Sequence, residues 1–336
     1  MTGKTGMSGG PRSMVWLLTT RCNLSCQHCY AARFADRGEL DAGQTMGIVQ
    51  DAARCGVKHI SFTGGEVFLR PDALPLIEYA GQAGISTSLV TNGSLMTRGL
   101  AGELARLNVF VSLSIDGAIE STHQRVRGKE TWELVMTAAR ALREAGARFS
   151  TVMAVSRLNQ QEVRDYLHLA RELGARAGSL IPVMPSGRAP LDMILSPGEM
   201  LTVLREANRT AEELDFPVSL WCTPFARLFA ESPRVSAGFC RTASQDVDVD
   251  PAGNVLLCDV LDDTFGNVTR YGVLNAWKEL EADPLVKSVT SPRLREPCIT
   301  CPIRSKCLGG CFARARLMTG DIHAPDPLCP RVGKVA

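Results

Sequence analysis

Three cysteines near the start of the sequence are the residues best suited to carry chemistry. Cys22, Cys26 and Cys29 follow a CxxxCxxC spacing in the run RCNLSCQHCY, just after the first strand-like segment. Three thiolates this close on one loop can hold three irons of a [4Fe-4S] cluster. The fourth iron then lacks a protein ligand, so it can chelate a small molecule and pass it an electron. A tetrahedral zinc site is the alternative, although zinc normally takes four ligands and favours paired CxxC motifs.

Composition limits the classes of protein that need to be considered. A chain of 336 residues with 45% hydrophobic content can bury one large core, or one large domain with a smaller one. A net charge of +2 argues against a nucleic-acid partner. The polar start lacks the apolar core of a signal peptide, and no later stretch is long enough to span a bilayer. We expect a cytoplasmic protein without a membrane partner, in which twelve cysteines indicate metal or redox chemistry.

Between Met14 and about Pro182 the sequence alternates short β-branched runs with amphipathic helical stretches. The predicted strands are Met14–Thr19, His59–Thr63, Ser86–Thr91, Val109–Ser114, Phe149–Val155 and Ser179–Val183. The predicted helices are Ala42–Arg54, Pro71–Ala83, Thr97–Leu107, Trp132–Ala145, Gln161–Leu173 and, further on, Gly198–Leu214. These units predict parallel strands joined by right-handed crossovers, with chemistry at the carboxyl ends of the strands. The periodicity allows either a curved sheet around a cavity or a flat doubly wound sheet.

Polar motifs follow the second, third and fourth predicted strands. They are the run Thr63-Gly64-Gly65-Glu66, the run Thr91-Asn92-Gly93, and the pair Ser114 and Asp116. Two glycines let the backbone approach a ligand, and a carboxylate beside them can hold an ammonium group. Ser114 and Asp116 alternate along an extended strand end, so both can point into the same cavity. Turns and helix caps are the alternative roles for these motifs.

The C-terminal third has few long periodic helices and is rich in cysteine. Its cysteines are Cys222, Cys240, Cys258, Cys298, Cys301, Cys307, Cys311 and Cys329. Metal clusters can stabilise such a loop-rich segment, and a zinc ribbon is the alternative. The run DPAGN at Asp250–Asn254 predicts a hairpin turn that brings Cys240 near Cys258. Cys55, by contrast, lies alone on a predicted helix, where a free cysteine usually packs.

The N-terminal triplet resembles the signature of the radical S-adenosylmethionine (SAM) superfamily. The later cysteines resemble its SPASM extension, named after subtilosin, pyrroloquinoline quinone, anaerobic sulfatase and mycofactocin maturation. All seven cysteines of that pattern are present, namely Cys240, Cys258, Cys298, Cys301, Cys307, Cys311 and Cys329. The resemblance implies an α/β fold with a flexible N-terminus at 1–13, a partial (β/α)6 TIM barrel at 14–215 and a SPASM iron-sulfur domain at 216–336.

The resemblance also implies three [4Fe-4S] clusters and a SAM site. Their ligands would be Cys22, Cys26 and Cys29 for the SAM cluster, Cys240, Cys258 and Cys311 for a first auxiliary cluster, and Cys298, Cys301, Cys307 and Cys329 for a second. The implied SAM contacts are His28, in the place of the family's usual aromatic ring, with Gly64, Gly65 and Glu66 at the amino group, Asn92, Ser114 and Asp116 at the ribose, and Arg127 or Arg125 at the carboxylate. Cys222 is either the missing fourth ligand of the first auxiliary cluster or a buried cysteine.

The implied chemistry is reductive cleavage of SAM to a 5′-deoxyadenosyl radical, which abstracts hydrogen from a substrate carbon. Asp259 matches an aspartate that takes a substrate proton in sulfatase-maturing relatives. A turn-forming role is its alternative, because Asp262 and Asp263 make the region acidic. We expect a peptide substrate that is crosslinked or oxidised. A step in porphyrin or other cofactor biosynthesis, of the haem d1 or pyrroloquinoline quinone type, is the second candidate.

The expected partners are the substrate precursor and a flavodoxin- or ferredoxin-type reductant. Only about a dozen residues precede the first strand, so we expect a peptide either to bind directly or to need a separate recognition protein. A non-catalytic iron-sulfur carrier is the alternative from another class of protein. The Glu66 motif and the pair Ser114 and Asp116 argue against it, because an electron carrier needs no nucleoside pocket.

Overall fold

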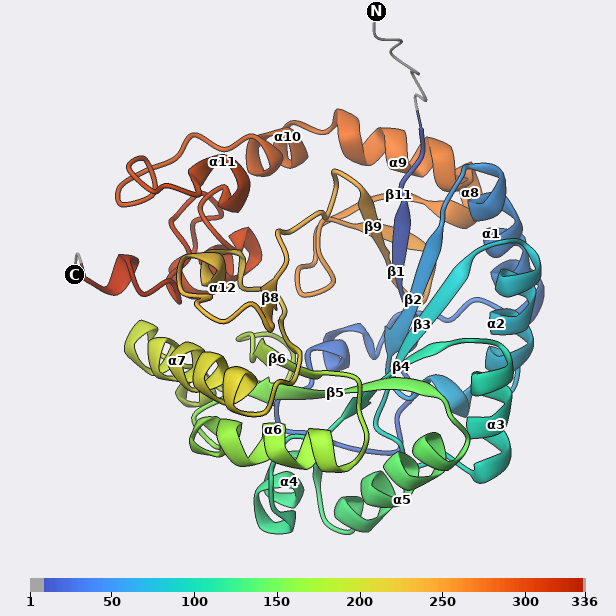
Figure 1. Cartoon of the computed structure of the whole chain (residues 1–336). Helices are drawn as coiled ribbons and strands as arrows, with labels where there is room; N and C mark the ends of the chain where they lie inside the picture. The colour runs from blue at the N-terminus through green and yellow to red at the C-terminus, as the bar shows by residue number, and fades with distance from the viewer. Residues whose placement is uncertain (1–8, 335–336) are drawn as a thin grey trace, which may run out of the picture.

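One curved sheet, covered on its outer side by helices, runs through the molecule (Figure 1). The computed structural model describes residues 9–334, so residues 1–8 of the predicted flexible N-terminus lie outside it. The sheet has eleven strands in the order β11-β10-β9-β1-β2-β3-β4-β5-β6-β7-β8. Its curvature confirms the partial barrel and excludes the flat doubly wound sheet.

The six predicted strands are present, parallel and adjacent in chain order. They are β1 (Ser13–Thr19), β2 (His59–Gly64), β3 (Ser86–Thr91), β4 (Phe110–Ser114), β5 (Arg148–Val155) and β6 (Gly178–Pro182). Trp16 of β1 lies opposite Phe62 of β2, and both side chains are buried. Apolar residues that face both sides of the sheet are typical of parallel strands covered by other chain segments.

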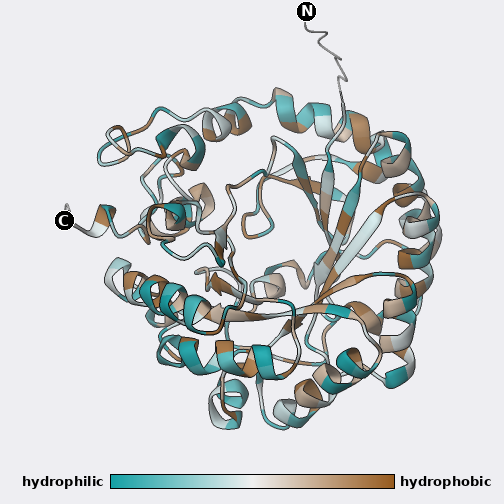
Figure 2. Cartoon of the chain, viewed as in Figure 1, coloured by the Kyte–Doolittle hydropathy of each residue, from teal (hydrophilic) through white to brown (hydrophobic). Residues whose placement is uncertain are grey.

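The predicted helices are also present, each within about two residues of its expected ends. They are α1 (Ala42–Arg54), α2 (Ala73–Gln82), α3 (Arg98–Arg106), α5 (Thr131–Glu144), α6 (Val163–Glu172) and α7 (Pro197–Glu213). In α6 the buried residues Val163, Tyr166, Leu167 and Ala170 recur with helical spacing. Figure 2 shows the resulting alternation of hydrophilic and hydrophobic residues along the outer helices. None of the helices in residues 9–334 is long and apolar enough to cross a membrane.

Helix α4 (Glu120–Arg127) was not predicted from the sequence. Its residues, ESTHQRVR, contain a single aliphatic side chain, Val126, so they carry no apolar stripe. The helix buries Thr122 and His123 together with Val126. It therefore forms where polar side chains have partners in the interior, a condition that periodicity does not reveal.

Five short strands extend the sheet into the C-terminal third. They are β7 (Val218–Leu220), β8 (Val235–Ala237), β9 (Asp246–Val249), β10 (Asn254–Leu256) and β11 (Thr264–Asn267). Strands of three or four residues are too short to show a period of two, so the sequence did not indicate them. β9 pairs in parallel with β1. The predicted hairpin at Asp250–Asn254 is confirmed, since β9 and β10 pair antiparallel across it.

The helices of the C-terminal third are short and run from the β11 edge of the sheet toward the β8 edge (Figure 1). They are α8 (Val268–Tyr271), α9 (Val273–Ala282), α10 (Pro284–Thr290), α11 (Arg304–Cys307) and α12 (Phe312–Thr319). Strands on both sides of residue 215 belong to the same sheet. The division into a barrel at 14–215 and a separate domain at 216–336 stays a prediction.

The two glycines after β2 lie against the loop that follows β1. Gly65 N donates to Thr19 O at 2.7 Å, and Glu66 N donates to Arg21 O at 2.8 Å. A Cβ on Gly65 would lie 2.0 Å from Arg21 O, and one on Gly64, whose φ is +119°, would lie 2.3 Å from Thr19 O. Contact between two backbone segments thus requires glycine at both positions.

We expect Gly65→Ala to lower the free energy of unfolding by about 2 kcal/mol or more, because one of the two loops must move away. Gly102→Ala is the matched control, since Gly102 lies inside α3 with open space around its Cβ position. It should leave stability unchanged or raise it by about 0.5 to 1 kcal/mol. Urea unfolding of the two variants measures the difference, and equal effects would refute this account of the glycine pair.

Candidate functional site

The loop at residues 20–29, here the three-thiol loop, follows the carboxyl end of β1. Cys22 is exposed, Cys26 is buried and Cys29 is half-buried, and all three are free thiols. A distant segment holds the loop in place: Arg188 donates from Nε to Cys26 O at 3.0 Å and from its backbone N to Cys29 O at 3.1 Å. This role of Arg188, which lies in the loop after β6, leaves no local pattern in the sequence.

The thiols of this loop influence one another electrostatically. The surrounding protein raises the pKa of Cys22, although part of the residue is exposed, and the negative charges of Glu66 and Cys29 raise it further. Burial also raises the pKa of Cys26. The positive charge of Arg127 lowers that pKa, and the negative charges of Cys29 and Cys22 raise it. Crowded thiolates repel one another unless a cation lies between them, and metal binding then releases their protons. The donor set therefore fits an iron-sulfur cluster with three protein ligands.

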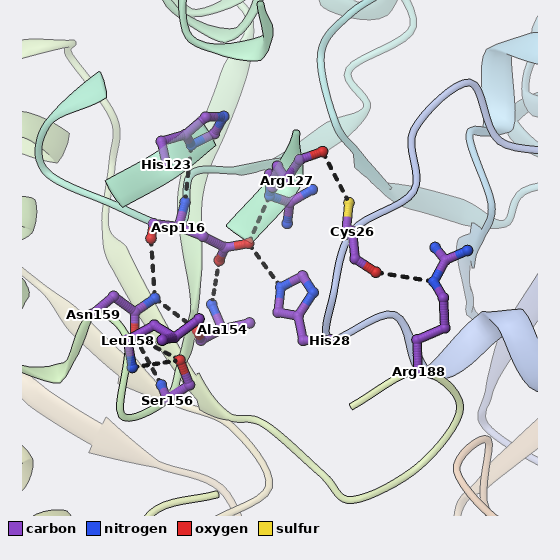
Figure 3. Close-up of polar contacts among 10 residues, drawn as sticks. All are labelled: Cys26, His28, Asp116, His123, Arg127, Ala154, Ser156, Leu158, Asn159 and Arg188. Atoms are coloured by element: carbon purple, nitrogen blue, oxygen red, sulfur yellow. Dashed lines mark hydrogen bonds and ion pairs between the residues drawn. The ribbon is translucent and has the colours of Figure 1, made fainter. Parts of the chain in front are cut away.

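The carboxylate of Asp116 connects several chain segments beside this loop (Figure 3). Its Oδ2 accepts from His28 Nε2 at 2.7 Å and from Arg127 Nε at 2.6 Å, and its Oδ1 accepts from Ala154 N at 2.7 Å. Asp116 is fully buried. It ties the three-thiol loop, α4 and β5 to the end of β4.

Charge explains why this carboxylate stays ionised. Burial by itself would raise the pKa of Asp116, but Arg127 and His28 hold that pKa well below its usual range. A carboxyl group whose pKa is lowered by folding stabilises the folded state at any pH above its ordinary pKa of 3.8. This stabilisation is lost as the pH falls toward the lowered pKa. Next to it, burial and then Arg127 lower the pKa of His123 to about 4. His123 is therefore neutral near pH 7, and its Nδ1 accepts from Asp116 N at 3.2 Å.

Two groups at this position are left available for a ligand. His28 Nδ1 is buried and has no hydrogen-bond partner within residues 9–334. In the same described part of the chain, the hydrogen bonds of Arg127 involve Nε and leave its two Nη nitrogens without a protein partner. A buried polar atom such as His28 Nδ1 normally has a partner, so it points to a polar ligand, and the Arg127 side chain beside it keeps 11% of its surface exposed. An anionic group is the natural partner of the guanidinium.

Glu66, the carboxylate of the glycine motif, is itself completely buried. Thr91 Oγ1 donates to both of its oxygens, at 2.8 and 2.9 Å, and Asn92 N donates to Oε2 at 2.9 Å. Burial raises the pKa of Glu66 despite these hydrogen bonds. The carboxylate thus fixes the backbone at the end of β3. Direct binding of an ammonium group by Glu66 stays a prediction.

The remaining expected SAM contacts lie near the three-thiol loop or in the wall beside it. Asn92 Nδ2 lies 3.8 Å from Cys22 Sγ and donates to Asn23 Oδ1 at 3.2 Å. Ser114 is only 5% exposed, so little of its surface is open to a ligand. Arg125 donates instead to the carbonyl of Leu158, so Arg127 is the one of these two expected arginines that lies beside the loop. The ribose contacts of Ser114 and Asp116 stay predictions.

A first four-thiol group consists of Cys222, Cys240, Cys258 and Cys311. These residues follow β7, β8 and β10 and begin α12. The surrounding protein raises the pKa of Cys222 well above its usual value, although part of the residue is exposed, and the charges of Cys311, Asp259 and Cys240 raise it further. Burial raises the pKa of Cys258 well above its usual value, and the charge of Cys311 adds to this effect. Cys222 therefore lies with the three cysteines that the family resemblance assigns to the first auxiliary cluster.

A second four-thiol group consists of Cys298, Cys301, Cys307 and Cys329. These residues line one cavity together with Phe225 and Leu228. Burial raises the pKa of Cys307 to about 12, with the charges of Cys329, Cys298 and Cys301 contributing. Four thiols that line one cavity, and whose thiolate forms would repel one another without a metal, match the donor set of a fully ligated cluster.

Asp259 lies between the three-thiol loop and the first four-thiol group. Cys258 Sγ is 3.7 Å from Asp259 Oδ1, and Asp259 N donates to Asp248 Oδ2 at 3.0 Å. Ligand atoms of Asp248, Cys258 and Asp259 all lie within 4.8 Å of one another. Burial and then the charge of Asp259 raise the pKa of Tyr30, which directly follows Cys29. Tyr30 and Asp248 were not predicted from the sequence, because both residues approach Asp259 only in the folded chain.

Comparison with known proteins identifies the family of the chain. Residues 16–170 match the model of the radical SAM superfamily. The mycofactocin maturase MftC of Mycobacterium ulcerans is 30% identical, over 95% of this chain and 88% of its own length. The chain belongs to the radical SAM superfamily. This radical SAM protein is also 28% identical to the AdoMet-dependent heme synthase of Methanosarcina barkeri, over 96% of the chain and 97% of that relative.

A solved structure supports the same fold. Streptococcus suis SuiB, bound to its precursor peptide SuiA, matches with a TM-score of 0.79 at 17% identity, over 96% of this chain and 76% of SuiB. The sequence-based resemblance is therefore confirmed: the chain is a radical SAM enzyme with a cysteine-rich extension of the SPASM type. The family uses SAM and a [4Fe-4S] cluster. The three-thiol loop carries the donors that fit that cluster.

Asp116→Asn should lower the free energy of unfolding by about 3 kcal/mol or more, because it leaves the buried Arg127 without its counter-charge. Glu103→Gln breaks an exposed ion pair with Arg106 and is the control, for which we expect no measurable change. Anaerobic urea unfolding compares the two. Similar stability of both variants would show that the Asp116 carboxylate does not hold this region together.

Proposed function

We propose that this radical SAM enzyme modifies a peptide by abstracting a hydrogen atom from one of its carbons. The observation that carries the proposal is the three-thiol loop, which lies beside Arg127 on one side and, through Tyr30, beside Asp259 on the other. When bound, the cluster and SAM supply a 5′-deoxyadenosyl radical. In the proposal Cys22, Cys26 and Cys29 hold the cluster and leave one iron to SAM.

The side chains around the loop have separate tasks in this proposal. Arg127, oriented by Asp116, binds the carboxylate of SAM through its Nη nitrogens. His28, held through Nε2, offers its Nδ1 to the same ligand. Backbone atoms at Gly64 and Gly65 receive the amino group, while Glu66 and Asn92 fix the neighbouring turn. Burial of these groups excludes water from the reacting atoms.

The two four-thiol groups would hold one auxiliary [4Fe-4S] cluster each. Four thiols at each place match four irons, so Cys222 is proposed as the fourth ligand of the first auxiliary cluster. Asp259 is proposed to accept the substrate proton. The neighbouring Asp248 is the more readily protonated residue of this pair, because burial and then the charge of Asp259 raise the pKa of Asp248 well above the usual range.

Two relatives support two substrate classes. The mycofactocin maturase, 30% identical over nearly the whole chain, favours a peptide. The AdoMet-dependent heme synthase, with near-complete coverage of both chains, favours a tetrapyrrole as the second candidate. Anaerobic incubation with SAM, dithionite and either a precursor peptide encoded near the gene or an iron porphyrin precursor separates them. The true substrate raises the yield of 5′-deoxyadenosine and changes in mass.

The proposal includes partners and a compartment. A one-electron donor of the flavodoxin or ferredoxin type would reduce the clusters, and a separate recognition protein would deliver a peptide. Three groups of free thiols, with eleven cysteines among them, need a reducing compartment such as the cytoplasm.

Cys26→Ala should reduce the formation of 5′-deoxyadenosine from SAM and dithionite by more than about 100-fold, because the SAM cluster loses one of its three ligands. Cys55→Ala is the control, since Cys55 lies at the end of α1, outside all three groups, and it should retain full turnover. Chromatography of the quenched reaction measures the nucleoside. Turnover that survives in Cys26→Ala would refute the proposed role of the loop.

Asp259→Asn should reduce product by about 100-fold or more while SAM cleavage persists, because the proton acceptor is lost and the SAM site is not. Asp262→Asn is the matched control on the same acidic segment, where the side chain is 77% exposed. Parallel assays of 5′-deoxyadenosine and modified substrate give the ratio. If product formation continues at the parent rate in Asp259→Asn, Asp259 is not the acceptor.

A further inference from the structure

A buried ion pair lies between the two four-thiol groups. Arg314 on α12 donates from Nη1 to Asp326 Oδ2 at 2.8 Å and to Oδ1 at 3.0 Å, and both side chains are fully buried. Such a pair gives up the hydration of both charges, and apolar residues of similar volume are often as stable. The contacts of this pair indicate a positioning role rather than a contribution to stability alone.

Its first set of contacts reaches the first four-thiol group. Arg314 Nη2 donates to Cys222 O at 2.7 Å, and Asp326 Oδ2 accepts from Cys311 N at 2.9 Å. Cys222 has a φ of 52°, in the left-handed region that residues other than glycine rarely adopt. The guanidinium therefore holds the carbonyl of a residue in an unfavourable conformation, and that conformation sets the direction of the Cys222 thiol.

The second set reaches the second four-thiol group. Asp326 O accepts from Cys329 N at 3.0 Å, and Asp326 N donates to Gly309 O at 2.8 Å, in the turn between Cys307 and Cys311. A Cβ on Gly310 would lie 2.2 Å from Asp326 Cβ. Gly310 thus leaves room for Asp326 beside the backbone of Cys311 and Cys329.

We propose that Arg314 and Asp326 are positioning residues shared by the two auxiliary sites, with Arg314 fixing Cys222 as the fourth ligand of the first cluster. Asp326 connects that site to the second one through Cys311 N and Cys329 N. The inference rests on the proposed function, because it requires that both groups bind clusters. Outer partners that orient metal ligands commonly change metal retention by 10- to 100-fold when they are removed.

The test uses the full chain with Cys22, Cys26 and Cys29 changed to alanine, so that the auxiliary sites alone carry iron. In this background Arg314→Lys keeps the charge but cannot reach Asp326 and Cys222 O together. We expect Arg314→Lys and Cys222→Ala each to speed the loss of iron from the first site to a chelator by about 10-fold or more. Both should also change the electron paramagnetic resonance (EPR) signal of that cluster, and the double variant should show no further change.

Arg316→Lys is the matched control, since Arg316 lies on the same helix but pairs with Asp263 and is 41% exposed. It should behave as the parent does. If Arg314→Lys does not fold, Asp326→Asn serves as the second variant, with the same expected change in the EPR signal. Parent behaviour of the Arg314 or Asp326 variant, or additive effects with Cys222→Ala, would overturn this inference. A parent without about eight irons per chain in this background would instead overturn the auxiliary clusters of the proposed function.

Discussion

The buried carboxylate of Asp116 is the interaction on which the geometry of the site depends. It joins His28 of the three-thiol loop, Arg127 of α4 and the backbone of β5 to the end of β4. In the low-dielectric interior these charge-assisted hydrogen bonds are strong, and an unpaired charge there would be costly. The segments that carry the thiols and the guanidinium therefore cannot shift independently. Asp116 acts by orientation, since none of its own surface is exposed.

A second constraint connects the C-terminal third to this centre. β9 pairs with β1, the strand that leads into the three-thiol loop, so the hairpin ending near Cys258 lies beside that loop. Tyr30 and Asp259 make the contact between them. The first four-thiol group and Asp259, the proposed proton acceptor, are thus attached to the same sheet that positions the three-thiol loop.

Much of this arrangement could be predicted from the sequence, because its signals are local. Spacing identified Cys22, Cys26 and Cys29, and the alternation of apolar runs located β1 to β6 within a residue or two. Turn chemistry located the hairpin at Asp250–Asn254. These features depend on neighbours in sequence, for which periodicity and residue type are sufficient.

Other features depend on contacts between distant residues and could not be predicted in this way. Helix α4 lacks an apolar stripe and is held by the burial of His123 and Val126. The contacts of Asp116 with Arg127 and His28 were not predicted, because the positions of these two side chains require the complete sheet. The place of Cys222 beside Cys311 depends on Arg314, which lies 92 residues further along the chain. Tertiary contacts of this kind leave no pattern in a single sequence.

The most direct test of the central claim is the EPR spectrum of the anaerobically reduced protein before and after SAM is added. We expect SAM to change the signal of the cluster on the three-thiol loop, since one iron there has no protein ligand. Cys26→Ala should lack both the signal and the change. An intact cluster on Cys22, Cys26 and Cys29 whose spectrum stays the same at saturating SAM would contradict this claim.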